Sequence, residues 1–138
     1  MAKRAAREDA ARKLAVAAAT IARDKNAEEI VVLDLRGQSP VTDYFVICTG
    51  SSGPQMRTVA GDIVAHARAT GHKPYHIHGA EGSGGWILLD FVDVVVHIFD
   101  PAHRRYYDLE LIWGESPKVR WRRSRDVARP RPAGTVQQ

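Results

Sequence analysis

The sequence of 138 residues contains one cysteine, Cys48, and no long apolar run. A single thiol cannot form an intramolecular disulfide, so a disulfide-stapled extracellular fold is excluded and a reducing compartment is favoured. The apolar runs fall well short of the roughly 20 residues that a membrane-spanning helix needs. The N-terminal stretch lacks the apolar core of a secretory signal, and Glu8 and Asp9 argue against an organellar transit peptide. We therefore predict a cytoplasmic protein with no membrane partner.

The sequence also lacks the common motifs of enzymes that bind nucleotide phosphates. The Gly50–Ser52 loop, in "TGSSGP", follows a predicted strand and precedes a predicted helix, where a helix N-terminus could bind a phosphate. It matches neither common glycine-rich phosphate motif, so a tight turn with a helix cap is the favoured interpretation. Nucleotidyltransferases hold two metal ions with a close Asp-x-Asp pair, which this sequence does not contain. A nucleotide-binding or nucleotidyltransferase-like enzyme that uses this loop remains the alternative function.

Other reactive side chains do not form a convincing site. His76 and His78 share one face of a predicted strand with Glu81 nearby, which is a conceivable metal site, but exposed histidines at a strand end are the favoured interpretation. Cys48 lies in an apolar strand and is expected to be an inert core residue. We predict no catalytic residue, no metal, no cofactor and no small-molecule substrate.

Charge is distributed unevenly, although the net charge is only +4. Residues 1–25 carry seven Lys or Arg against three Asp or Glu, and residues 114–138 carry seven against two. The middle of the chain, residues 26–113, carries six against eleven. An acidic domain between two basic ends predicts partners of both signs.

Hydrophobic periodicity predicts the order helix, strand, strand, helix, three strands, helix. The first helix covers residues 8–25, and the second follows Ser52 with a buried stripe of Met56, Val59, Ala60, Ile63 and Ala67. The last begins at Asp100 and Pro101, with Tyr106, Leu109 and Trp113 expected to point inward. This order predicts an α/β sandwich with a five-stranded mixed sheet flanked by helices.

Residues 84–99, "GGWILLDFVDVVVHIF", predict two antiparallel strands joined by a turn at residues 90–93. We expect Leu89 to pair with Val94 and Trp86 with His97, which separates two faces. One face is wholly apolar and belongs to the core: Ile87, Leu89, Val94, Val96 and Ile98. The other mixes aromatic, aliphatic and charged residues: Trp86, Leu88, Asp90, Asp93, Val95, His97 and Phe99. That composition favours a protein-docking surface, the alternative being a face covered by another helix.

Three segments together resemble the ribosomal silencing factor (Iojap-like) family: "LDLRGQSPVTDYFVICTGSS", "EG" followed by "WILLDFVDVVVHIF", and "RYYDLELIW". The resemblance covers residues 30–113. It implies a nucleotidyltransferase-like α/β fold without the catalytic carboxylates. It also implies a protein that binds the large ribosomal subunit through ribosomal protein fourteen, blocks joining of the small subunit, and so represses translation when nutrients are scarce. A role in large-subunit maturation is implied as well.

The resemblance and the face analysis together predict the residues that contact the ribosomal protein: Asp43, Tyr44, Trp86, Leu88, Asp90, Asp93, His97 and Tyr107. The family's characteristic positions also include Glu81, Gly82, Leu109, Glu110 and Trp113. Val92 departs from the family, which often has glycine at this turn position. A homodimer through the same face would compete with ribosome docking.

Residues 1–113 are therefore predicted to form one ribosomal silencing factor domain, and residues 114–138 a basic, Pro- and Arg-rich disordered tail. We expect the tail to contact ribosomal RNA through Arg120, Arg122, Arg123 and Arg125, with Trp121 available to stack on a base. The alternative is a solvated, solubilising tail.

Overall fold

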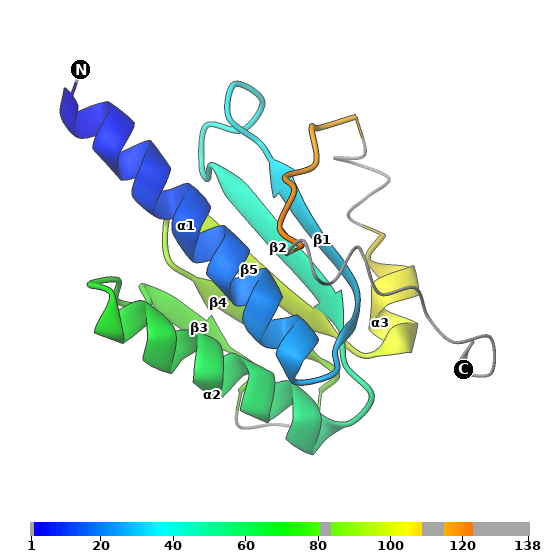
Figure 1. The fold of residues 1–138 in the computed structure, drawn as a ribbon. Helices are drawn as coiled ribbons and strands as arrows, with labels where there is room; N and C mark the ends of the chain where they lie inside the picture. The colour runs from blue at the N-terminus through cyan, green and yellow to red at the C-terminus, as the bar shows by residue number, and fades with distance from the viewer. Residues whose placement is uncertain (1, 81–83, 109–114, 123–138) are drawn as a thin grey trace.

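The computed structural model describes residues 2–80, 84–108 and 115–122 (Figure 1). The elements are α1 (Ala2–Asp24), β1 (Glu28–Asp34), β2 (Tyr44–Thr49), α2 (Gly53–Ala69), β3 (His76–His78), β4 (Trp86–Asp90), β5 (Val94–Phe99) and α3 (Pro101–Tyr106). Their order is the predicted one, and α1 begins earlier than expected.

The sheet is five-stranded and mixed, which confirms the predicted fold class. Its strand order is β1-β2-β5-β4-β3. The two central strands, β2 and β5, run parallel, while every other neighbouring pair is antiparallel. The chain leaves β2, forms α2, and returns in β3 at the far edge, so β5 and β4 later fill the space between them. The carboxyl ends of both central strands therefore lead directly into helices α2 and α3.

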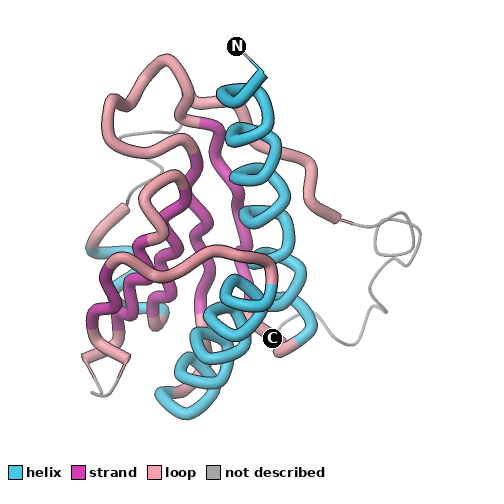
Figure 2. Tube along the Cα trace, turned by 90° about the vertical axis from the view of Figure 1, so that its left-hand side faces the viewer, coloured by secondary structure: helices cyan, strands magenta, loops and turns pink. Residues whose placement is uncertain are grey.

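Both long helices lie on the same side of the sheet, and α3 lies on the other side (Figures 1 and 2). Alanine supplies much of the buried side of α1, including Ala15, Ala18, Ala19 and Ala22, and its small side chain lets a helix approach a sheet closely. The buried residues of α2 are the five that the periodicity predicts, so that stripe is confirmed. The main core therefore lies between these helices and the inner face of the sheet.

The β4–β5 hairpin has the predicted faces but a different register. Leu89 pairs with Val96 and Leu88 with His97, so each partner is displaced by two residues from the prediction. The turn begins one residue later because the Phe91 N–H donates to the Val94 carbonyl. An even displacement keeps every side chain on its predicted face.

Val92 lies at the tip of this hairpin in the left-handed region, with φ of 75°. The Asp93 N–H donates to the Phe91 carbonyl, which makes Val92 the central residue of a γ-turn. The Asp90 carboxylate stabilises the turn by accepting from the Val92 N–H at 2.8 Å. A β-branched residue in this conformation is strained.

Residues 116–122 form a segment, here called the strap, that lies along the outer edge of β1. The Asp34 N–H donates to the Pro117 carbonyl and the Val119 N–H to the Val32 carbonyl, each at 2.8 Å. Ser116 donates to the side chain of Gln38 at 2.6 Å. The predicted disordered tail, which starts at residue 114, therefore includes a segment that pairs with the sheet. The physical reason is that the edge strand β1 carries unpaired backbone N–H and C=O groups, and the strap bonds to them.

Side chains of the strap alternate between core and solvent. Val119 and Trp121 belong to the main core, and Trp121 is only 9% exposed. The expectation that Trp121 stacks on a base is therefore wrong. Arg120 and Arg122 point to solvent. The other two predicted RNA-binding residues, Arg123 and Arg125, lie outside the described residues.

Helix α3 begins as predicted, with the Asp100 carboxylate accepting from the His103 N–H at 2.7 Å. The helix ends at Tyr106, whose side chain is 79% exposed. The predicted inward position of Tyr106 is wrong because the helix is too short to continue the expected periodicity. Leu109 and Trp113 lie outside the described residues.

Candidate functional site

The sheet face that points away from α1 and α2 carries most of the predicted docking residues. We call it the mixed face; it comprises Trp86, Leu88, Asp90, Val95, His97 and Phe99 from β4 and β5, with Phe45 from β2 and Tyr107 just after α3. Trp86, Leu88, Asp90 and Val95 are half-buried. A second, smaller core lies on the same side of the sheet and comprises Leu33, Leu35, Ile47 and Phe99.

Aromatic rings gather at the end of the mixed face where β4 begins and β5 ends. The Trp86 ring lies 4.8 Å from the Tyr107 ring and 5.5 Å from the Phe99 ring, measured between centroids. Tyr107 remains 39% exposed, so the outer side of this stack reaches the surface. Stacked aromatic pairs contribute about 0.5–1.5 kcal/mol beyond their buried area, and they lose little conformational entropy when a partner binds.

His97 supports this stack from below, being only 6% exposed. Trp86 donates its indole N–H to His97 Nδ1 at 3.3 Å, which leaves the ring proton on Nε2. Phe45 packs edge-to-face on the imidazole, with centroids 4.8 Å apart. Burial lowers the pKa of His97 to about 4, so the ring is neutral near pH 7. We infer that His97 positions Trp86 and does not itself form the docking surface.

Asp90 places a carboxylate at the end of the mixed face. It lies opposite His76 on β3 and opposite Val95 on β5. Its hydrogen bond to Val92 fixes one carboxylate oxygen and ties the charge to the hairpin turn. The mixed face therefore combines an aromatic end, around Trp86 and Phe99, with an acidic end at Asp90.

Asp93 lies elsewhere, which corrects its predicted place on this face, and Asp43, predicted only as a partner contact, lies beside it. Arg7 of α1 holds the Asp93 carboxylate with two hydrogen bonds of 2.8 Å, so Asp93 turns toward the helical side of the sheet. Asp43, Glu8 and Asp93 line one hollow beside α1. Burial, followed by the charges of Asp93 and Glu8, raises the pKa of Asp43. These residues form a separate acidic corner.

Tyr44 also departs from its predicted place, because it is fully buried in the main core beneath α1. Its neighbour Phe45 occupies the mixed face instead. The alternation of β2 could have shown this. Phe45 pairs with Val95, which lies two positions from His97 on the same face, whereas Tyr44 pairs with Val94 on the core face. A partner cannot contact Tyr44 directly.

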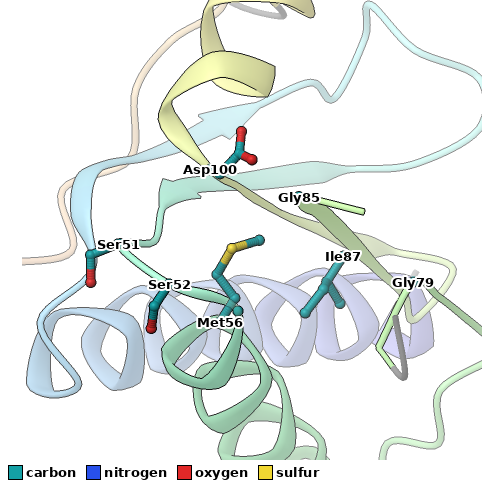
Figure 3. A pocket seen from close by; sticks show the side chains of 8 residues that line it. Ser51, Ser52, Met56, Gly79, Gly85, Ile87 and Asp100 are labelled. Atoms are coloured by element: carbon teal, nitrogen blue, oxygen red, sulfur yellow. The ribbon is translucent and has the colours of Figure 1, made fainter. Parts of the chain in front are cut away.

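The Gly50–Ser52 loop borders a hollow of about 200 Å³ that also reaches Asp100 (Figure 3). Ser52 is the N-cap of α2 and accepts from the Gln55 N–H at 3.1 Å, while Ser51 contacts the Gln55 side chain. The Met56 side chain lies between this loop and Asp100 (Figure 3). A Cβ at Gly50 would meet Met56, so this glycine is required by internal packing. The geometry is that of a helix cap, as favoured above.

Metal-binding and nucleophilic groups show no further site within residues 2–80, 84–108 and 115–122. No group of three or more His, Cys, Asp or Glu there could hold a metal ion. His76 and His78 are exposed and stacked, with ring centroids 6.1 Å apart, and Glu81 lies outside these ranges. Burial raises the pKa of the Cys48 thiol to about 12, as expected for an inert core cysteine.

Comparison with known proteins identifies the family. The model of the family described as "Ribosomal silencing factor during starvation" matches residues 8–138. The chain belongs to the ribosomal silencing factor family. The match includes the strap, which agrees with its place in the fold.

Relatives of the ribosomal silencing factor family cover most of this chain. The ribosomal silencing factor RsfS of Bacillus subtilis is 42% identical over 100 residues, which are 72% of this chain and 84% of that protein. A crystal structure from Chromobacterium violaceum has a TM-score of 0.68 and 33% identity, covering 77% of this chain and 85% of its own. A second, from Bacillus halodurans, has a TM-score of 0.64 and 38% identity, covering 78% and 94%. Among the described residues of this family member, no helix has the length and apolar character needed to cross a membrane.

Proposed function

We propose that this chain is a non-catalytic, cytoplasmic factor that binds the large ribosomal subunit and blocks joining of the small subunit. The contact is made with large-subunit ribosomal protein fourteen, and the consequence is repression of translation when nutrients are scarce. A further role in large-subunit maturation belongs to the same proposal. The membership of the family and the composition of the mixed face support it.

The observation that carries the proposal is the contact of the Trp86 and Tyr107 rings, with Tyr107 39% exposed, on a sheet face whose opposite end carries the Asp90 carboxylate. Binding hot spots are enriched in Trp and Tyr at the centre of a contact, with charged groups around them. Ribosomal proteins are generally basic, and an acidic rim speeds encounter with a basic partner and excludes acidic ones. Residues 26–113 carry the excess of acidic residues that such a partner requires.

Co-sedimentation with purified large ribosomal subunits tests this function. We expect the wild-type protein to sediment with large subunits and the Trp86→Ala variant to bind at least roughly 30-fold more weakly, which corresponds to a hot-spot loss of about 2 kcal/mol. Thermal unfolding must show that the variant remains folded. A wild-type protein that stays in the supernatant would contradict the proposal.

Charge reversal offers a matched pair of variants. Asp90→Arg places a cation against the basic partner and should abolish binding. Asp9→Arg makes the same change on the exposed side of α1, which lies across the sheet from the mixed face, and should leave binding unchanged. Equal loss in both variants would assign the effect to net charge and remove Asp90 from the interface.

Two further contacts belong to this proposal. Arg120 and Arg122 on the strap would contact ribosomal RNA, and their double substitution by glutamine should reduce the salt dependence of binding without removing Trp121. A homodimer through the mixed face would hide Trp86. Sedimentation velocity of the wild-type protein and the Trp86→Ala variant would reveal such a dimer and show whether large subunits dissolve it.

A further inference from the structure

A second surface lies at the C-terminal end of α2, where the chain turns toward β3. A hollow of about 490 Å³ is lined by Arg68, Gly71, Lys73 and Pro74. Arg68 and Lys73 are both exposed, and no ion pair joins either of them to another residue in the described part of the chain. Two cations therefore border an open depression.

The helix itself does not need these cations as caps. The N–H groups of Thr70, Gly71 and His72 already donate to the last carbonyls of α2, and the Thr70 hydroxyl donates to two of them. These bonds reach three of the four carbonyl groups that a helix end leaves without partners, those of His66, Ala67 and Arg68. The side chains of Arg68 and Lys73 remain available for an external anion.

The surroundings of the hollow favour a negatively charged partner. The sequence contains no Asp or Glu from residue 63 to residue 80. Tyr75 follows the hollow directly in sequence, and its side chain is 78% exposed. An exposed aromatic residue that directly follows the lining residue Pro74 in sequence, together with two cations, suits nucleic acid, because cations bind phosphates and an aromatic ring stacks on an unpaired base.

The hollow adjoins the acidic end of the mixed face. The Tyr75 N–H donates to the Asp90 carbonyl at 2.7 Å, and the neighbouring His76 pairs with Asp90 across the sheet edge. The α2–β3 connection and the end of β4 consequently lie at the same end of the sheet (Figure 1). A partner that engages Asp90 would bring its surroundings against Arg68 and Lys73.

We propose that this hollow binds RNA on the surface of the large ribosomal subunit, beside the protein that the mixed face contacts. Arg68 and Lys73 bind phosphates, and Tyr75 stacks on an unpaired base. The proposal rests on the proposed function, because it takes the ribosome as the partner. It adds a second contact of opposite charge, so that the site selects a surface where a basic protein lies next to RNA.

A salt series with purified large subunits tests the inference. Each phosphate contact contributes roughly 0.7–0.9 to the slope of log affinity against log salt concentration, so Arg68→Gln with Lys73→Gln should reduce the slope by about 1.4–1.8. The control, Arg12→Gln with Lys13→Gln, removes the same charge from the exposed side of α1 and should leave the slope unchanged. Tyr75→Ala should weaken binding by roughly five-fold or more without changing the slope.

The outcomes separate the two proposals. A wild-type protein that does not bind large subunits would contradict the proposed function itself. Wild-type binding with identical slopes for the Arg68→Gln, Lys73→Gln variant would overturn the RNA contact and leave the mixed-face contact intact. The slope could also be reduced while polyglutamate, and not polyuridylate, competes with large subunits for the wild-type protein. That result would identify an acidic protein as the partner of the hollow and would overturn the RNA contact.

Discussion

Replacement of Trp121 by alanine tests whether the strap is part of the fold. Trp121 is about nine-tenths buried in the main core, and it follows two backbone hydrogen bonds that join the strap to β1. Removal of a large buried aromatic side chain costs about 3–5 kcal/mol. Domains of this size have a total stability of roughly 5–15 kcal/mol, so the loss is a large fraction of it.

Thermal unfolding followed by circular dichroism is the appropriate assay. A loss of about 3–5 kcal/mol at roughly 3 °C per kcal/mol lowers Tm by roughly 10 °C or more. Arg120→Ala is the matched control, since the neighbouring side chain points to solvent and its removal should change stability by less than about 0.5 kcal/mol. Equal Tm values for the wild-type protein and the Trp121→Ala variant would refute the place of this tryptophan in the core.

Truncation extends the same test. A chain that ends after Gly114 lacks the strap and should unfold at much lower temperature, whereas a chain that ends after Arg122 keeps each strap contact described above. Weaker ribosome binding by the shorter chain could therefore result either from loss of folding or from loss of an RNA contact, and a binding experiment alone does not distinguish the two. Similar stability of both truncated chains would show that the strap contributes little.

Other predictions concern strain, ionisation and the α2 cap. Val92→Gly should raise the free energy of unfolding by about 1 kcal/mol, because it relieves a positive φ at an exposed turn; lower stability in urea would contradict this. His97 has a pKa of about 4 against an ordinary 6.5, so stability should be constant above pH 6.5 and fall by about 3 kcal/mol as pH drops to 4. His97→Gln should remove that fall, and its persistence would exclude His97 as the cause. Ser52→Ala should cost about 1 kcal/mol through loss of the N-cap, and millimolar ATP should not change Tm; stabilisation by ATP would favour the nucleotide-binding alternative.

Local periodicity was sufficient to predict the elements whose burial follows a regular pattern. The buried stripe of α2 and the two faces of β4 and β5 follow directly from periods of 3.6 and two residues. The hairpin register did not follow, because it depends on a turn in which Val92 adopts a conformation that valine rarely occupies. Propensity rules favour glycine at a position with positive φ. Because residue 92 is valine, those rules do not predict a turn that begins at Phe91.

Contacts between distant segments were beyond local patterns. Strand alternation predicts Asp93 on the mixed face, and nothing near it in sequence indicates that Arg7, from the first helix, holds its carboxylate. The strap was missed for a different reason. Its arginine and proline content predicts a disordered tail, while the alternation of Val119 and Trp121 with solvent-facing arginines was a short strand signal that composition outweighed.

The position of the strap has a consequence for how the chain is made. β1 is synthesised early, yet the segment that covers its outer edge comes from the last part of the described chain. During synthesis the edge of β1 therefore stays uncovered until residues 116–122 have emerged, and contacts between distant segments form slowly. A nascent chain that stalls before residue 116 would expose a strand edge and the core beneath Trp121, both of which promote aggregation.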